Sequence, residues 1–292
     1  MRLRQTIIHS DACCYTQSMS ITSLNGKIAF IGGGNMASAI ISGLRRQGMV
    51  AEQFIVIEPF APQREKLLAD FGIAALEQPS KILAQAQQVV WAVKPQTFRE
   101  AAAQVSAHTK EALHLSVMAG ITSGSMAQQL STQRIVRAMP NTPALIGKGI
   151  AGLFARAAVS EADKLSVEAL MATTGEHLWV TDESHLDAVT ALSGSGPAYV
   201  FFFIEAMMRA GQSMGLNEQQ SRQLAQSTFA GAAELARQSP DSPEVLRQRV
   251  TSKGGTTYAA ITSMQDSLVG QHFEQALRAA GQRANELGRE FG

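Results

Sequence analysis

The chain has 292 residues, enough for two domains, and its 25 basic and 24 acidic residues leave a formal net charge of +1. So balanced a charge argues against a protein that binds nucleic acid by neutralising phosphates. The longest apolar run, Ala198 to Ile204, is far shorter than the ~20 residues of a membrane-spanning helix, so we expect no membrane partner. The low charged fraction of 17% predicts extensive burial, for example between subunits.

Both cysteines, Cys13 and Cys14, are adjacent and lie near the N-terminus. Adjacent cysteines make a poor structural disulfide, so we expect a reducing, cytoplasmic location. The six histidines are scattered, with no pair three or four residues apart, which argues against a metal site. Residues 1–26 are polar and lack periodicity, and we expect a disordered or non-native extension there, with a mitochondrial presequence as the alternative.

From Lys27 onward, short apolar segments alternate with helical patterns. Strands are predicted at Lys27–Ile31, Phe54–Glu58, Gln88–Val93, Leu113–Val117 and Arg134–Met139. Helices are predicted from the glycines at 32–34 to near Gly48, and at Ala61–Phe71, Gln96–Ala107, Ser123–Leu130 and Ser160–Met171. Two segments, Gly152–Phe154 and Leu178–Val180, could extend the edge of the sheet. The alternation predicts an α/β Rossmann domain over residues 27–181, with a doubly wound, mostly parallel sheet.

Strand patterns end at Val180, and residues 182–292 are predicted to form an all-helical domain for dimerisation. Helices are expected at Leu186–Leu192, at Ala198–Met214, from the capping pair Asn217 and Gln220 to Gln238, from Ser242 to Val250, and twice after Gly254-Gly255. The turn S-G-S-G-P, residues 193–197, is expected to break the first of these. A segment as apolar as Tyr199–Met208 has to be buried on nearly every side, most easily by interlocking with a second copy.

The segment G-G-G-N-M-A, residues 32–37, follows the first strand and opens the first helix. It fits the G-x-G-x-x-A variant of the dinucleotide fingerprint: Gly32 permits the tight turn, Gly34 lets a pyrophosphate approach, and Ala37 keeps helix and strand close. The helix N-terminus adds N–H groups and a positive dipole end. In this strand–turn–helix context the glycines predict a dinucleotide site, although a glycine string alone also occurs in ordinary tight turns.

Glu58 ends the second strand, where an acidic side chain can accept hydrogen bonds from the adenosine ribose. A carboxylate there would repel a 2′-phosphate, which favours NADH over NADPH. Arg64 is close enough in sequence to reverse that preference, and Glu58 could also be a solvated strand end. The sequence therefore leaves the cofactor as NADPH or NADH.

Three further loops stand out. A-V-K-P-Q (92–96) and M-P-N-T-P (139–143) end parallel strands, where open α/β sheets place ligands. T-S-K-G-G-T-T (251–257) leads glycines and small hydroxyl residues into a helix, and the free N–H groups there suit a carboxylate. An ordinary helix cap is the alternative. The S-G-S-G-P turn fails the nucleophilic-serine pattern, since it joins helix to helix.

Five segments in this order resemble pyrroline-5-carboxylate reductase: F-I-G-G-G-N-M-A, A-V-K-P-Q, R-A-M-P-N-T-P, D-A-V-T-A-L-S-G-S-G-P-A-Y and T-S-K-G-G-T-T. The resemblance spans Lys27 to the C-terminus, and the last two segments are specific to that family. It implies reduction of 1-pyrroline-5-carboxylate to L-proline with NADH or NADPH. It also implies a Rossmann domain joined to a helical domain that interlocks into a homodimer, with dimers often forming decamers. Substrate and nicotinamide would share a cleft between the domains, near the dimer interface.

The resemblance also assigns roles to individual residues. The cofactor-binding positions it implies are Gly32, Gly34, Asn35 and Met36 at the pyrophosphate, and Val93, Lys94, Pro95 and Ala119 on the ribose and nicotinamide side. The substrate-binding positions it implies are Glu183, Ser252, Gly254, Gly255, Thr256 and Thr257, and Thr257 would also hydrogen-bond the ring nitrogen as the catalytic residue. Two features depart from the family: Glu58 replaces the small hydroxyl residue of NADPH-preferring members, and Gln78-Pro79 occupies a stretch that often holds asparagine.

The sequence offers no clear enzymatic acid, and an imine substrate does not need one. A protonated C=N already carries positive charge, so hydride addition needs no strong enzymatic acid, whereas a ketone does. The long apolar helix has no lysine, only Glu205 and Arg209, which are predicted to pair, and His185 is interpreted as structural. A related imine or hydroxyacid reductase and a non-catalytic NAD(P)H sensor remain alternatives.

Overall fold

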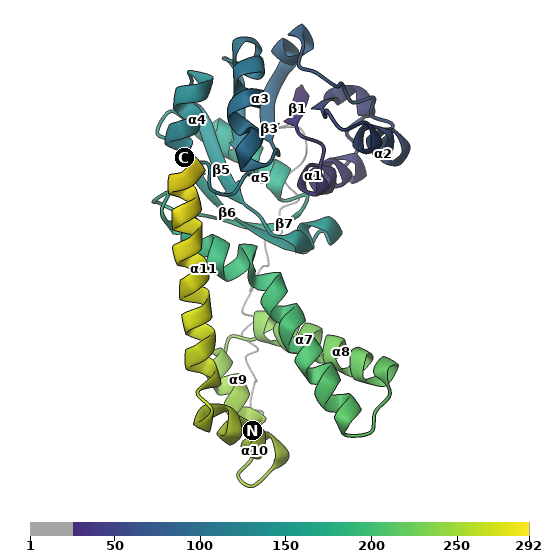
Figure 1. Cartoon of the computed structure of the whole chain (residues 1–292), viewed down its shortest axis with the longest axis vertical. Coiled ribbons are helices and arrows are strands. Elements are labelled where there is room, and N and C mark those ends of the chain that lie inside the picture. The colour runs from purple at the N-terminus through teal and green to yellow at the C-terminus, as the bar shows by residue number, and fades with distance from the viewer. Residues whose placement is uncertain (1–25, 292) are drawn as a thin grey trace, which may run out of the picture.

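The computed structural model describes residues 26–291, which form a sheet domain and, below it in Figure 1, two arms of helices. The expected extension at residues 1–26 lies outside the described residues except for Gly26, and so do both cysteines. Within residues 26–291, no helix is long and apolar enough to cross a membrane. The same range contains no cluster of three or more His, Cys, Asp or Glu side chains that could hold a metal ion.

Seven strands form one mixed sheet in the order β2-β1-β3-β4-β5-β6-β7. They are β1 (Lys27–Ile31), β2 (Phe54–Ile57), β3 (Ala86–Trp91), β4 (Leu113–Ser116), β5 (Ile135–Met139), β6 (Gly149–Ala155) and β7 (Gly175–Trp179). The first five in the sheet are parallel, β6 pairs antiparallel with β5, and β7 runs parallel to β6. The predicted doubly wound, mostly parallel sheet is confirmed, and both proposed edge segments are strands.

The side chains of β1 show why helices cover both faces of the sheet. Because side chains alternate along a strand, Ile28 and Phe30 pack on one face and Ala29 and Ile31 on the other. Strands that are apolar on both sides are typical of parallel sheets with two helical layers. The first layer holds α1 (Asn35–Arg46), α2 (Ala61–Phe71) and α5 (Glu161–Met171), and the second holds α3 (Phe98–Val105) and α4 (Ser123–Leu130).

The C-terminal part is helical, as predicted. Its helices are α6 (His185–Val189), α7 (Gly196–Ser213), α8 (Glu218–Gln238), α9 (Pro243–Arg249), α10 (Thr256–Asp266) and α11 (Val269–Phe291). The predicted cap of α8 is confirmed, because the side chains of Asn217 and Gln220 each accept a hydrogen bond from the other's backbone N–H. α7 packs on α8 in one arm, while α9, α10 and α11 form the other (Figure 1). The domain boundary at 181/182 stays a prediction; it lies between β7 and α6.

The break expected at residues 193–197 is narrower than predicted, because only Ser195 forms a bend between two helical stretches. A π-helical turn, Thr190–Gly194, joins α6 to α7, and Pro197 lies in the first turn of α7, where its missing N–H costs no hydrogen bond. The side chain of Asn141, from the M-P-N-T-P loop, donates to the carbonyl of Ser193 at 3.3 Å. Ser193 and Gly194 therefore continue the helical path, and the interruption before α7 is limited to Ser195.

Helix α11 ties the helical arms to the sheet domain. Its 23 residues span about 35 Å, and it runs from the tip of one arm back to the sheet (Figure 1). Near its end, Leu287 lies so close to Gly120 that an added Cβ there would come within 3.3 Å of it. Phe291 packs against the core under α3 and α4, and Asn285 donates a hydrogen bond to Asp187 at 3.1 Å.

Candidate dinucleotide cavity and anion-binding helix

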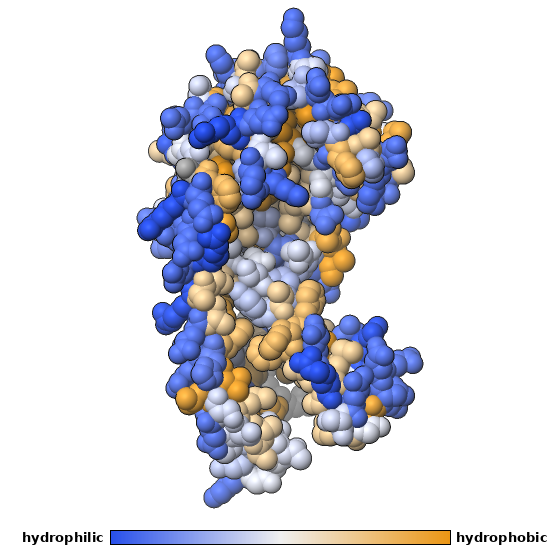
Figure 2. Space-filling model, in the orientation of Figure 1, coloured by the Kyte–Doolittle hydropathy of each residue, from blue (hydrophilic) through white to orange (hydrophobic). Residues whose placement is uncertain are grey.

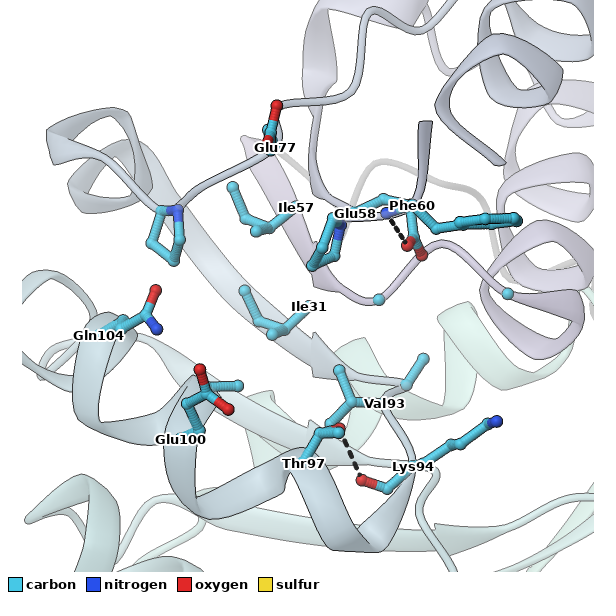
Figure 3. A pocket seen from close by; sticks show the side chains of 16 residues that line it. Ile31, Ile57, Glu58, Phe60, Glu77, Val93, Lys94, Thr97, Glu100 and Gln104 are labelled. Atoms are coloured by element: carbon cyan, nitrogen blue, oxygen red, sulfur yellow. Dashed lines mark hydrogen bonds between the residues drawn. The ribbon is translucent and has the colours of Figure 1, made fainter. Parts of the chain in front are cut away.

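A cavity of about 530 Å³ opens at the carboxyl ends of β1, β2 and β3 (Figure 3). Since β1 lies between β2 and β3, the chain reverses its winding direction here, and open α/β sheets bind ligands at such a point. The residues that line the cavity are Ile31, Gly32, Gly34, Ile57, Glu58, Pro59, Phe60, Glu77, Pro79, Ala92, Val93, Lys94, Thr97, Glu100, Ala101 and Gln104.

The glycine loop has the geometry that a pyrophosphate requires. Gly32 has a φ of +94°, and a Cβ there would come within 2.6 Å of the carbonyl oxygen of Ala92. A Cβ at Gly34 would meet no atom within 4 Å, so the space beside this backbone is open. α1 begins at Asn35 without a side-chain cap or an acidic residue in its first turn. Its N–H groups are therefore available to an anion, and the loop fits a dinucleotide.

Glu58 projects at the end of β2 and is held by two backbone donors. The N–H of Gly33 donates to its Oε2 at 2.8 Å, and the N–H of Phe60 donates to its Oε1 at 2.9 Å. Arg64 lies nearby, but its Nη1 donates to the carbonyl oxygens of Glu58 and Pro59 at 2.9 and 2.6 Å. Glu58 therefore has a fixed carboxylate at the cavity.

Five of the nine predicted cofactor residues line this cavity: Gly32, Gly34, Glu58, Val93 and Lys94. Asn35 and Met36 begin α1 beside the glycine loop, and Pro95 opens the turn after Lys94, whereas Ala119 lies in the loop after β4. Sequence reasoning missed Phe60, Glu77, Thr97, Glu100 and Gln104. The last three recur at intervals of three and four residues behind A-V-K-P-Q, so helical periodicity after that loop could have found them.

The segment T-S-K-G-G-T-T forms a turn that opens α10. Gly254 has a φ of +78°, and the N–H of Gly255 donates to the carbonyl of Ser252 at 3.0 Å. Gly255 precedes the helix without a side-chain cap, and no acidic residue lies in the first turn. Thr256 is exposed and Thr257 is half-buried at this end. The helix therefore presents uncapped N–H groups beside two hydroxyls, an arrangement that suits a carboxylate.

Within one chain, the dinucleotide cavity and the N-terminus of α10 lie far apart. In Figure 1, α10 lies at the opposite end of the molecule from β1 and β3, which border the cavity. The single cleft between domains that the resemblance implies is therefore not formed within one chain.

The structure gives Glu183 partners in the sheet domain. Its Oε1 accepts from the N–H of Ser123 at 2.6 Å and from Nη1 of Arg137 at 2.7 Å, and its Oε2 accepts from the Ser123 hydroxyl at 2.5 Å. Burial raises the pKa of Glu183, but these hydrogen bonds together outweigh it and hold the pKa below 4.5. The carboxylate thus connects α4 and β5 to the segment that leads into α6.

The comparisons with known proteins cover both domains. The model for pyrroline-5-carboxylate reductase dimerisation matches residues 183–287, and the model for NADP oxidoreductase coenzyme F420-dependent matches residues 27–120. The pyrroline-5-carboxylate reductase of Pseudomonas aeruginosa is 44% identical over 268 residues, which are 91% of this chain and 98% of that protein.

Two solved structures agree with this match. The pyrroline-5-carboxylate reductase from Coxiella burnetii is 35% identical with a TM-score of 0.83, over 90% of this chain and 98% of that one. The Plasmodium falciparum pyrroline carboxylate reductase, solved with NADP bound, is 26% identical with a TM-score of 0.81, again over 90% and 98%. On the identity to its relatives along nearly its whole length, the chain belongs to the pyrroline-5-carboxylate reductase family.

Proposed function

We propose that this chain reduces 1-pyrroline-5-carboxylate to L-proline by hydride transfer from NADH or NADPH, the last step of proline biosynthesis. The observation that carries the proposal is the 44% identity to a pyrroline-5-carboxylate reductase over 91% of the chain. The two matching family models also span every residue that lines the cavity and the whole of Thr251–Thr257. Both parts of the site therefore fall within matched regions.

The cofactor would lie in the cavity at the ends of β1, β2 and β3. Its pyrophosphate would receive N–H groups from the start of α1, with Gly32, Gly34, Asn35 and Met36 beside it. Its ribose and nicotinamide would lie along Val93, Lys94, Pro95 and Ala119. When bound, the reduced nicotinamide supplies the hydride.

The substrate carboxylate would bind at the N-terminus of α10, to Ser252, Gly254, Gly255, Thr256 and Thr257. The Thr257 hydroxyl would hydrogen-bond the ring nitrogen and fix the orientation of the imine. Because a protonated imine is already electrophilic, this positioning is the main task of the chain's own residues. On α7, Nη1 of Arg209 lies 3.6 Å from Oε2 of Glu205, as predicted, so these two side chains pair with each other and are not assigned a role in acid catalysis.

Glu183, expected as a further substrate contact, already has both carboxylate oxygens engaged by Ser123 and Arg137. We therefore propose that Glu183 is a positioning residue that connects the sheet domain to the helical arms.

The active unit would be an interlocked homodimer in which α10 of one copy reaches the cavity of its partner. Support comes from α7, on which four large apolar side chains are exposed: Val200, Phe201, Phe202 and Met207. Figure 2 shows hydrophobic residues along the inner sides of the two arms, where the surface is hollowed. A second copy would cover them, and such dimers could associate further into a decamer. The chain has only two cysteines, and because they are adjacent they make a poor structural disulfide, which supports a reducing, cytoplasmic location.

The test is the loss of absorbance at 340 nm when purified protein meets 1-pyrroline-5-carboxylate with NADH or NADPH in separate cuvettes. Oxidation that depends on the imine is the expected result. A folded protein that binds nucleotide but oxidises it with neither combination would contradict the proposal, and a six-membered imine would be tried next. A sensor without catalysis would also bind nucleotide equally well with and without proline.

A further inference from the structure

Beyond the reaction itself, we propose that Glu58 makes this enzyme selective for NADH over NADPH, and that the glycine loop fixes its carboxylate for that role. The inference rests on the proposed function only in taking the cavity as the dinucleotide site.

The carboxylate of Glu58 cannot turn away from the cavity without losing hydrogen bonds. Each of its two oxygens is held by a different backbone N–H, one from Gly33 and one from Phe60. A Cβ at Gly33 would lie 2.6 Å from Cδ1 of Leu67, so a larger residue here would have to displace the end of that buried side chain beside Glu58. Figure 3 shows the bond from Phe60 and the position of Glu58 at the cavity wall. The negative charge is therefore a fixed part of the site.

A fixed carboxylate distinguishes the two cofactors by chemistry. An ionised carboxylate is an acceptor only, and each oxygen has lone pairs left for a ribose hydroxyl in addition to its backbone donor. NADH carries a 2′-hydroxyl, which donates to such an acceptor. NADPH carries a 2′-phosphate at the same atom, which has negative charge and acceptor oxygens that face another anion. The geometry thus favours NADH at this point.

The other charged residues of the cavity act in the same direction. Three carboxylates line it, those of Glu58, Glu77 and Glu100, against one ammonium group, that of Lys94. Figure 3 shows Lys94 on the wall opposite Glu58 and Glu77. A cavity with an excess of negative charge adds to the cost of a phosphate near Glu58.

Arg64 is the cation whose position in the sequence could have reversed this preference. Its Nη1 donates to the carbonyl oxygens of Glu58 and Pro59, and its Nη2 faces Glu77 at 3.4 Å. Its guanidinium therefore stabilises the backbone at the end of β2, and it is not among the residues that line the cavity. To bind a 2′-phosphate, Arg64 would have to give up these partners.

The test measures nucleotide affinity without any imine, by energy transfer from tryptophan to the reduced nicotinamide. For the unaltered protein we expect NADH to bind at least about tenfold more tightly than NADPH. Glu58→Gln keeps the size of the side chain and one acceptor oxygen but removes the charge. In this variant the ratio of the Kd for NADPH to the Kd for NADH should fall to about threefold or less, chiefly because NADPH binds more tightly. The ratio in the unaltered protein should also shrink as salt is raised.

Glu65→Gln is the matched control, because Glu65 is exposed on α2 and does not line the cavity; its ratio should equal that of the unaltered protein. Equal affinities of the unaltered protein for both nucleotides would overturn the inference, and so would a preference that survives Glu58→Gln unchanged. A strong preference for NADH in a protein that reduces no imine would leave this inference standing and remove the proposed function. Failure to bind either nucleotide would remove both.

Discussion

The sheet domain buries most of its large apolar side chains within one chain, and the helical domain leaves many of its own exposed. Phe30, Ile40 and Leu115 of the sheet domain are completely buried. Phe201 and Phe202 of α7 are 59% and 61% exposed, although they belong to the most apolar segment of the chain. Among the described helices of the second domain, α9 and α10 have no buried residue at all.

The difference arises from how each domain can cover its apolar surface. The strands of the sheet alternate their side chains toward two helical layers, so each layer closes one face. The helices of the second domain lie in two arms (Figure 1), which meet where Phe273 of α11 packs edge-on against Tyr199 and Phe203 of α7, and this contact leaves other apolar residues of α7 exposed. We therefore expect their exposed apolar residues, which lie in the region that matches the dimerisation model, to form the interface with a second copy, whereas the first domain alone carries a complete core.

The largest effect should come from breaking that interface. Phe202→Asp would place a charge in the surface that a partner covers, and we expect the dimer to dissociate and activity to fall at least about 100-fold. Size-exclusion chromatography with light scattering would show the dissociation. Both tryptophans, Trp91 and Trp179, lie in strands of the sheet domain, so their fluorescence should report that this domain is still folded.

Leu68→Asp is the control for this variant. Leu68 is 55% exposed on α2, in the domain with its own core, and we expect the dimer and the activity to persist. If Leu68→Asp dissociates the protein as Phe202→Asp does, exposed apolar residues do not distinguish the two domains as described.

The core of the sheet domain should make its stability depend on pH through His114. Burial lowers the pKa of His114 to about 4 from 6.5, the hydrogen bond to the Thr109 carbonyl partly opposes this, and Arg134 adds to it. Because the folded-state pKa lies below the unfolded one, the stabilisation is complete above pH 6.5 and is lost as pH falls toward 4, by about 3 kcal/mol.

Urea unfolding followed by tryptophan fluorescence at pH 7 and pH 4.5 measures this loss. In the folded protein, the indole N–H of Trp91 donates to Nδ1 of His114 at 2.9 Å, so protonation there also displaces a hydrogen bond. His114→Gln removes the titrating group and should flatten the pH dependence, even though its stability at pH 7 is lower. The same slope in both proteins would show that His114 is not the cause.

At the N-terminus of α10, Thr257→Ala should lower turnover by about tenfold to a hundredfold and leave nucleotide affinity unchanged. The reason is that Thr257 would orient the imine and does not line the dinucleotide cavity. Ser263→Ala, at an exposed position on the same helix, is the control and should keep full turnover. Unchanged kcat in Thr257→Ala would remove this residue from the mechanism.

The smallest effect is expected at the junction of the two domains. Glu183→Gln weakens the bonds to Ser123 and Arg137, and since Glu183 is partly exposed we expect a loss of about 2 kcal/mol in unfolding free energy. KM for the imine should stay near its original value if Glu183 positions the domains. Glu176→Gln, at an exposed position of β7, should change neither quantity. A raised KM with unchanged stability would instead make Glu183 a substrate contact.

Most secondary structure could be predicted because the signals are local. The bounds of β1, α2 and α4 agree with the expected ones to the residue, since apolar periodicity and flanking turn residues mark their ends. The reversed direction of β6 and β7 could not be predicted, because strand direction depends on connections in space. The extension of the helical path through Ser193 and Gly194 was missed, because no local pattern shows that Asn141, fifty-two residues away, donates a hydrogen bond to the Ser193 carbonyl.

The candidate site likewise contains residues that local patterns predict and residues that they do not. Gly32, Gly34 and Glu58 were found because strand ends and glycine spacing place them without knowledge of the whole fold. Phe60 and Glu77 enter the cavity through the path of the loops after β2, which no short pattern specifies. Nor could the sequence show that α10 lies far from the cavity of its own chain.

The most direct test of a site shared between two copies is a mixed dimer. Gly34→Asp places a carboxylate beside the pyrophosphate position, and its φ of −68° and open surroundings accept aspartate. Thr257→Glu places a carboxylate at the substrate's end of α10, where the first turn of a helix tolerates it. Each variant alone should be inactive. Differently tagged copies of the two, co-expressed so that they pair at random, should recover about a quarter of the original activity, because half the dimers are mixed and each has one intact site. Mixed dimers that form and stay inactive would contradict the shared site.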